Sequence, residues 1–174
     1  MSVFTPRSLD VDVVLDLMIH DIDIVLSLVR SEIQQIQAVG LPVLSSRADI
    51  AHVRVQFENG CVANFTASRV STEKIRKLRF FQPRQYISVD YGRQDGAVFS
   101  VSPSNQVQFA PLAVARAEPL EREMAAFLDA VKKRTAGRVS GEDGRRALAV
   151  ALRIVREMEL HATVVAATIA GQEQ

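Results

Sequence analysis

The sequence has little of several features that mark particular classes of protein. Its single cysteine, Cys61, allows no intrachain disulfide and no thiolate metal cluster. Asp or His breaks the longest apolar stretches well short of the roughly 20 residues that a membrane span needs. The first ten residues, MSVFTPRSLD, lack the basic and apolar segments of a signal peptide. The net charge of +1 gives no signal for nucleic acid or an acidic membrane. We therefore expect a cytoplasmic protein that binds neither.

A dinucleotide-binding fingerprint is also absent. The eight glycines never form G-x-G-x-x-G between a strand and a helix, so we expect no Rossmann domain and no bound NAD(P) within this chain. There is no internal repeat, low-complexity segment or interdomain linker. With 174 residues and 48% hydrophobic residues, the chain is predicted to be a single domain, residues 1–174, that is long enough for a core of its own.

A β-hairpin with a definite register is predicted from AHVRVQF and CVANFTAS. With Glu58-Asn59-Gly60 as the loop, Val53 faces Phe65 and one face is wholly apolar, whereas a two-residue loop would mix the faces. Gly60 would supply the left-handed residue that such a loop requires. Phe57 then faces Cys61, Val55 faces Ala63 and Ala51 faces Ala67, and the opposite face carries His52, Arg54, Gln56, Asn64, Thr66 and Ser68.

The other segments complete an α+β fold. MSVF, EIQQIQAVGLPVL, KLRFFQP, QYISVDY, AVFSV and QVQFA are extended in character, and turn signals such as Gly92 and SPSN separate the later ones. Two helices follow. The first carries an apolar stripe (Leu120, Met124, Phe127, Leu128 and Val131), with Gly137 where its stop belongs; the second begins with a capping box, Ser140 and Asp143. We predict a mostly antiparallel open sheet with helices packed on one face.

An unusual polar seam runs along a further predicted helix, from about Asp12 to Leu28, where Asp10 or Asp12 could act as N-cap. At ~100° per residue, five polar side chains fall within a sector of about 80°: Asp12, Asp16, His20, Asp23 and Ser27. Asp21 points elsewhere, and every other residue from Val13 to Val29 is apolar. The pattern indicates a helix that is buried nearly all round.

Two interpretations of the seam compete. A solvent-facing stripe is usually wider and uses Lys, Glu, Arg and Gln, none of which occurs here. Short side chains on a rigid helix suit a positioned site, and Asp16 and His20, at i and i+4, can meet as a general acid/base pair, with Asp23 one turn further on. A metal site made by these three residues is a weaker alternative, because one helix rarely supplies a full ligand shell. His52 and His161 are interpreted as ordinary surface residues.

The basic run EKIRKLRFFQPR is open to two interpretations as well. A solvated strand face is favoured, and a phosphate-facing patch is the alternative. The run carries Lys74, Arg76, Lys77, Arg79 and Arg84.

The segment VVLDLMIHDIDIVLSLV resembles the D-x-x-x-H-x-x-D helix of the glucose–fructose oxidoreductase / inositol dehydrogenase (Gfo/Idh/MocA) family. VQFENGCVANFTASRVS is similar to the central hairpin of that family, and EPLEREMAAFLDAV with VSGEDGRRALAVALRIVREM is similar to its closing helices, so the resemblance covers nearly the whole chain. Within the family, ASRVSTEKIRKLRFF and HDIDIVLSLV most resemble the sugar-nucleotide dehydrogenase branch. The Rossmann fingerprint and an EKP-like segment, where the family places its catalytic lysine, are missing.

The resemblance implies the C-terminal substrate-binding and oligomerisation domain of an NAD(P)-dependent dehydrogenase that acts on a sugar, polyol or sugar nucleotide. NAD or NADP would belong to the full-length parent. Catalytic residues carried over from the family pattern are Asp16 and His20, with His20 as acid/base. Supporting or substrate-binding candidates are Asp23, Arg7, Arg69 and Lys74. A homodimer through the open sheet face is expected. The alternatives are a non-catalytic dimerisation module and, third, a metal-dependent hydrolase.

Overall fold

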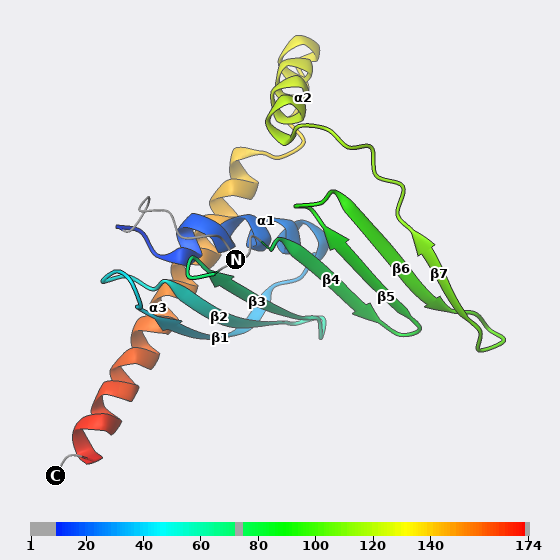
Figure 1. The fold of residues 1–174 in the computed structure, drawn as a ribbon. Coiled ribbons are helices and arrows are strands. Elements are labelled where there is room, and N and C mark those ends of the chain that lie inside the picture. Colours follow the sequence, from blue (N-terminus) through cyan, green and yellow to red (C-terminus); the bar gives the residue numbers. More distant parts are fainter. Residues whose placement is uncertain (1–9, 72–74, 173–174) are drawn as a thin grey trace. The chain divides into compact units, whose positions relative to one another are not determined.

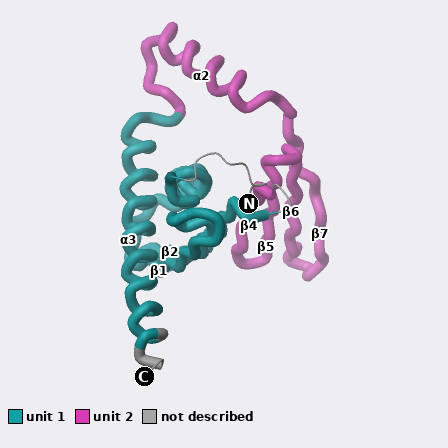
Figure 2. Tube along the Cα trace, turned by 60° about the vertical axis from the view of Figure 1, so that its left-hand side comes forward, with its two compact units in different colours: residues 1–72, 139–174 teal, residues 73–138 magenta. Residues whose placement is uncertain are grey.

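The computed structural model describes residues 10–71 and 75–172. Its backbone contacts divide the chain into two compact units, where the sequence predicts a single domain. Unit 1 comprises residues 1–72 and 139–174, and unit 2 comprises residues 73–138 (Figure 2). The α+β class is confirmed, with the strands divided between two antiparallel sheets. Within the described ranges, no helix has the length and apolarity required to cross a membrane. The predicted MSVF strand lies outside the described residues.

Unit 1 is built on a three-stranded sheet, β1 (Ile33–Leu41), β2 (Ile50–Phe57) and β3 (Val62–Ser68), in the order β1-β2-β3. A short π-helical turn, η1 (Val14–Met18), continues into α1 (Ile19–Leu28), and α3 (Gly141–Gln172) follows unit 2 in the chain. η1 contacts β3, and α3 contacts both β1 and α1 (Figure 1). Gly40 allows α3 a close approach, since a Cβ there would lie 2.6 Å from Sδ of Met158.

The hairpin register is confirmed. Ala51 pairs with Ala67, Val53 with Phe65 and Val55 with Ala63, and the amide of Phe57 donates to the carbonyl of Cys61 at 2.9 Å. Gly60 has a φ of +84°, as the three-residue loop requires. One expectation is wrong: Ser68, assigned to the polar face, is buried, because at the strand end its hydroxyl bonds the backbone of Val70 instead of water.

The core of unit 1 lies between this sheet and the helices. It includes Val14, Met18 and Ile22 of η1 and α1, Val53, Val55 and Phe57 of β2, and Ala151 and Ile154 of α3. Only one side of the first helical segment is buried within the described residues. Leu15, Leu17, Ile19 and Ile24 are half-buried and Leu28 is exposed, so burial nearly all round is not observed.

Unit 2 contains a four-stranded meander, β4 (Lys77–Gln82), β5 (Gln85–Asp90), β6 (Asp95–Val101) and β7 (Val107–Pro111), and α2 (Pro119–Lys133). The apolar stripe of α2 is exposed, and all the buried apolar side chains among the described residues belong to unit 1. An aromatic row crosses the four strands: Phe81, Tyr86, Phe99 and Phe109 pair in register, with ring centroids 5.0–5.6 Å apart.

Local hydrogen bonds determine where α3 begins and where α2 ends. Ser140 and Asp143 form the predicted capping interactions at the start of α3. α2, however, ends at Lys133 instead of near Gly137. Arg134 takes the left-handed conformation (φ +52°), and the amide of Thr135 donates to the carbonyl of Ala130 at 3.0 Å. This early closure satisfies a terminal carbonyl before the glycine is reached.

Candidate functional site

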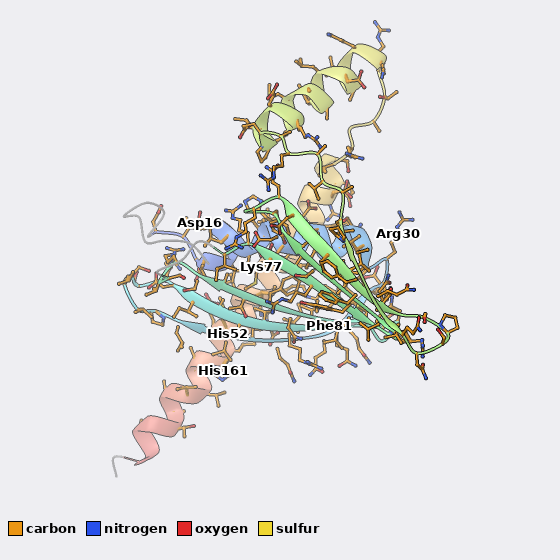
Figure 3. The ribbon with its side chains drawn as sticks, turned by 45° about the vertical axis from the view of Figure 1, so that its right-hand side comes forward. Asp16, Arg30, His52, Lys77, Phe81 and His161 are labelled. Carbon is orange, nitrogen blue, oxygen red and sulfur yellow. The ribbon has the colours of Figure 1, made fainter. Side chains whose placement is uncertain are left out.

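The polar seam begins in a π-helical turn. Asp16 lies within η1, with its side chain 32% exposed, and Figure 3 labels it on this helical segment. His20, in the first turn of α1, is exposed, and Asp23 is half-buried one turn later. Single π-helical turns are rare and occur frequently at functional sites. The seam therefore combines two carboxylates and an exposed imidazole on one helical segment.

Asp12 has a structural role instead of a capping one. Its Oδ1 accepts a hydrogen bond from the amide of Ala48 at 3.0 Å, and the carbonyl of Ala48 accepts from the amide of Val13 at 2.9 Å. The N-cap of η1 is Val13, which makes no side-chain capping bond. Capping of this helix by Asp12 is therefore a wrong prediction; Asp12 instead ties the start of the helix to the segment that precedes β2.

Asp16 has a cationic neighbour from the end of β3. The Nη2 atom of Arg69 lies 4.0 Å from Oδ2 of Asp16 and donates to the carbonyl of Val11 at 2.6 Å. The Nε atom of the same guanidinium lies 3.7 Å from Oδ1 of Asp49. Arg69 is only 4% exposed and Asp49 is fully buried. One buried guanidinium therefore lies between two carboxylates, one of which belongs to the seam.

Asp49 is held in its ionised form by the loop before β2. Burial raises the pKa of its carboxyl, but hydrogen bonds from the backbone amides of Leu44, Val43 and Ser45, and from the Ser45 hydroxyl, outweigh that effect and lower the pKa from 3.8 to about 2. The three amides reach Oδ2 at 2.6–2.9 Å, and the hydroxyl reaches Oδ1 at 3.0 Å. At neutral pH the cluster therefore contains a permanent buried negative charge beside Arg69.

His20 is available to solvent and to a ligand. No hydrogen bond or ion pair joins it to Asp16 or Asp23 in the part of the chain that the structure describes. The structure brings Asp16 together with Arg69, whereas the sequence suggested a direct contact with His20. An exposed imidazole can exchange a proton with a bound hydroxyl and pass it to water.

Several other sequence candidates are engaged elsewhere or lie outside the described ranges. Arg7 and Lys74 belong to residues that are not described. In the basic run, Lys77 pairs with Asp90 at 3.4 Å, and Arg84 donates to the carbonyls of Val101 and Ser102 and to Asn105. These two cations thus stabilise the meander itself.

A groove of about 710 Å³ lies elsewhere in unit 1, and neither Asp16 nor His20 lines it. Its walls are the three strands and the C-terminal half of α3. They include His52 and His161, which Figure 3 shows close together and away from Asp16. His52 bonds Thr66 at 3.2 Å. Among the described residues there is no group of three or more His, Cys, Asp or Glu that could hold a metal ion, so Asp16, His20 and Asp23 do not form one.

Asp49 was missed by sequence reasoning, although a signal for it exists. Residues 51, 53, 55 and 57 of β2 face the core, and Asp49 has the same parity. Arg69 likewise continues the inward row of Phe65 and Ala67. Because Ala51 pairs with Ala67, the same register places Asp49 opposite Arg69. Two opposite charges at facing core positions indicate a buried pair.

The chain is similar to known oxidoreductase domains. A sequence model described as the GFO/IDH/MocA C-terminal domain matches residues 3–89. UDP-N-acetylglucosamine 3-dehydrogenase of Acidithiobacillus ferrooxidans is 37% identical over 162 residues, which is 88% of this chain and 51% of that protein. The chain thus spans about half the length of this curated relative.

Solved structures show the same fold. A crystal form of the Acidithiobacillus ferrooxidans enzyme superposes with a TM-score of 0.84 at 36% identity, covering 91% of this chain and 51% of that one. Levoglucosan dehydrogenase in complex with NADH and levoglucosan gives a TM-score of 0.76 at 17% identity, covering 86% and 48%. At that lower identity the likeness is one of fold alone.

Proposed function

The chain belongs to the family of GFO/IDH/MocA C-terminal domains, and from this premise we propose that it is the substrate-binding and oligomerisation half of an NAD(P)-dependent dehydrogenase. The substrate class is a sugar, a polyol or, by preference, a sugar nucleotide. The relative that is 37% identical is a UDP-N-acetylglucosamine 3-dehydrogenase, which supports the sugar-nucleotide choice. Because the chain spans 51% of that relative, the activity is proposed for the whole protein that contains the chain.

The cofactor is expected to be bound outside residues 1–174. A dinucleotide pyrophosphate is normally held by a Gly-rich turn between a strand and a helix, and the described residues contain no such turn. NAD or NADP would supply the hydride acceptor for oxidation of an alcohol. The residues of this chain would bind the alcohol and manage its proton.

In the proposed mechanism His20 is the acid/base and Asp16 is the fixed acceptor. The neutral imidazole takes the proton of the substrate hydroxyl as the hydrogen on the same carbon departs as hydride, which leaves a carbonyl. The exposed His20 then releases that proton to water. The Asp16 carboxylate, held beside Arg69, accepts a hydrogen bond from a substrate hydroxyl and orients it. The observation that carries the proposal is that an exposed imidazole and a carboxylate beside a buried guanidinium lie on one helical segment.

The test is His20→Ala in the whole protein, with UDP-N-acetylglucosamine and either NAD or NADP as the probes. We expect a fall in kcat of about 10²- to 10⁴-fold, the usual contribution of general acid/base catalysis, with an unchanged circular dichroism spectrum. Formation of the reduced nicotinamide is followed by its absorbance. His161→Ala, a second exposed histidine in the same unit, is the matched control and should leave kcat unchanged. Near-normal turnover by His20→Ala would rule out the acid/base role.

We also propose a homodimer that uses an open sheet face. The aromatic row supports it, because Phe81, Phe99 and Phe109 are exposed on one face of the meander, and contiguous exposed apolar surface often marks a protein interface. The polar face of β2 and β3, with His52, Arg54, Asn64 and Thr66 exposed, offers hydrogen-bonding groups of the kind found in an interface rim.

A further inference from the structure

Arg69 and Asp49 occupy facing core positions at the ends of two paired strands. The amide of Arg69 donates to the carbonyl of Asp49 at 3.0 Å, so the backbone pairing of β2 with β3 extends one step beyond its last apolar pair. Both side chains are buried there. A buried pair of this kind rarely adds stability over apolar residues of the same size, and it is often retained for a specific role.

The anionic partner of this pair is fixed by its own loop. The carboxylate of Asp49 accepts four hydrogen bonds from Val43, Leu44 and Ser45, so its position follows from the backbone of that loop. Asp49 in turn lies 3.7 Å from Nε of Arg69. This leaves the far end of the guanidinium directed to the start of the helical segment.

At that far end Nη2 contacts one group just before η1 and one group within it. It donates to the carbonyl of Val11 at 2.6 Å and lies 4.0 Å from Oδ2 of Asp16. The second distance is beyond hydrogen-bond length, so the attraction is electrostatic, and it is only partly screened because the guanidinium is buried while the Asp16 side chain is 32% exposed. Arg69 is 4% exposed, so its guanidinium has little surface to offer to a substrate phosphate.

We propose that Arg69 is a positioning residue that holds the Asp16 carboxylate in place for substrate binding, with Asp49 as the buried anion that fixes Arg69. The planar guanidinium suits this task because Nη2 donates to the carbonyl of Val11 while the delocalised charge lies within 4.0 Å of the carboxylates of Asp49 and Asp16. A lysine ammonium is a single point charge and cannot span the three. The catalytic part of this assignment rests on the proposed function; the positioning part does not.

The positioning part is tested by the side-chain rotamer of Asp16, measured as three-bond scalar couplings by NMR on the isotopically labelled protein. We expect a single χ1 rotamer for Asp16 in the unmodified protein and averaged couplings in Arg69→Lys. Arg69→Lys keeps the positive charge, so it remains usable where Arg69→Met fails to fold. Arg54→Met, on the exposed face of β2, is the matched control and should leave Asp16 unchanged. A single Asp16 rotamer in Arg69→Lys, or averaged couplings already in the unmodified protein, would overturn the proposal.

The catalytic part is tested by a double-variant comparison with the same sugar-nucleotide probe. Arg69→Lys should lower kcat/KM about 10- to 100-fold, the scale of a small misplacement of a binding group. In an Asp16→Asn background the same change should have no further effect, because Arg69 acts through Asp16. A loss that persists undiminished in Asp16→Asn indicates a general structural role and contradicts the assignment. If the unmodified protein shows no turnover, the proposed function fails, while the rotamer measurement still decides the positioning role.

Discussion

Replacement of Asp49 by Asn should destabilise unit 1 in a manner that depends on pH. The variant removes one buried charge but keeps the size of the side chain. The carboxylate accepts three backbone amides on Oδ2 and the Ser45 hydroxyl on Oδ1. An amide side chain has only one acceptor oxygen, and its NH₂ group would face Ser45 or Arg69. Whichever way it turns, either a buried donor loses its acceptor or the guanidinium of Arg69 loses its buried anionic neighbour.

The magnitude follows from the pKa of Asp49. A fall from 3.8 to about 2 corresponds to about 2 kcal/mol at roughly 1.4 kcal/mol per pKa unit. Removal of one partner of a buried ion pair costs about 3–5 kcal/mol, and Arg69 keeps Val11 and Asp16 as neighbours. We therefore expect Asp49→Asn to lower the free energy of unfolding at pH 7 by about 2–5 kcal/mol.

The sign of the pH dependence is determined by the direction of the shift. Because the pKa of Asp49 is lower in the folded than in the unfolded protein, ionisation of Asp49 stabilises the fold above the unfolded value of 3.8. That contribution is lost as the pH falls from 3.8 through about 2. The difference in stability between the unmodified protein and Asp49→Asn should therefore shrink over this range.

Urea unfolding followed by far-ultraviolet circular dichroism measures the difference. Tyrosine fluorescence is unsuitable, because the chain has no tryptophan and both of its tyrosines lie in unit 2. Amide hydrogen exchange at Val43, Leu44 and Ser45 adds a local readout, since these amides bond Asp49. The control is Asp23→Asn, the same change at a half-buried residue of the seam. Its free energy of unfolding should stay within about 0.5 kcal/mol of that of the unmodified protein. Equal stability of Asp49→Asn at pH 7, or a difference that does not shrink in acid, would refute the reasoning.

Two further predictions concern the hairpin loop and the assembly. Gly60→Ala should lower the free energy of unfolding by about 1 kcal/mol, because a φ of +84° is unfavourable for a residue with a side chain, although nothing lies within 4 Å of the added Cβ. The control is Gly144→Ala in α3, where the space is equally open, and it should be neutral or stabilising. A neutral Gly60→Ala would show that the loop does not need the left-handed residue. Sedimentation velocity of the whole protein should give a dimer that Phe109→Ser weakens at least tenfold in Kd; a monomer, or a dimer of unchanged Kd, would contradict use of the aromatic row.

The hairpin was predictable because its information is local. Alternation of apolar residues on both sides of Glu58-Asn59-Gly60 leaves one register that keeps a face apolar, and the structure has that register. The capping box at Ser140 is equally local. The end of α2 was not predictable in this way, since Arg134 closes the helix although Gly137 is available. The position at which a helix ends depends on which of its terminal carbonyls find hydrogen-bond donors, and residue type only favours one position over another.

The seam itself could be found from the sequence, but its partner could not be found from the helix alone. Asp16, His20 and Asp23 share a face because helical periodicity requires it, and that pattern suggested a contact between Asp16 and His20. The neighbour of Asp16 is Arg69, which is 53 residues further along the chain and reaches it from the end of β3. Contacts of this range depend on how the sheet packs against the helix.

The sequence by itself determined the class of the fold, the register of the central hairpin and the polar seam, because each depends on periodicity and on neighbours a few residues away. The hairpin register already places Asp49 opposite Arg69, but only the tertiary structure decided which charge of the seam lies beside that pair. Asp49 and Arg69 meet because two strands place their ends side by side, and Asp16 joins them because η1 contacts β3. Such a cluster is stable only where water is excluded and every charge has a partner, and a packed core alone provides that.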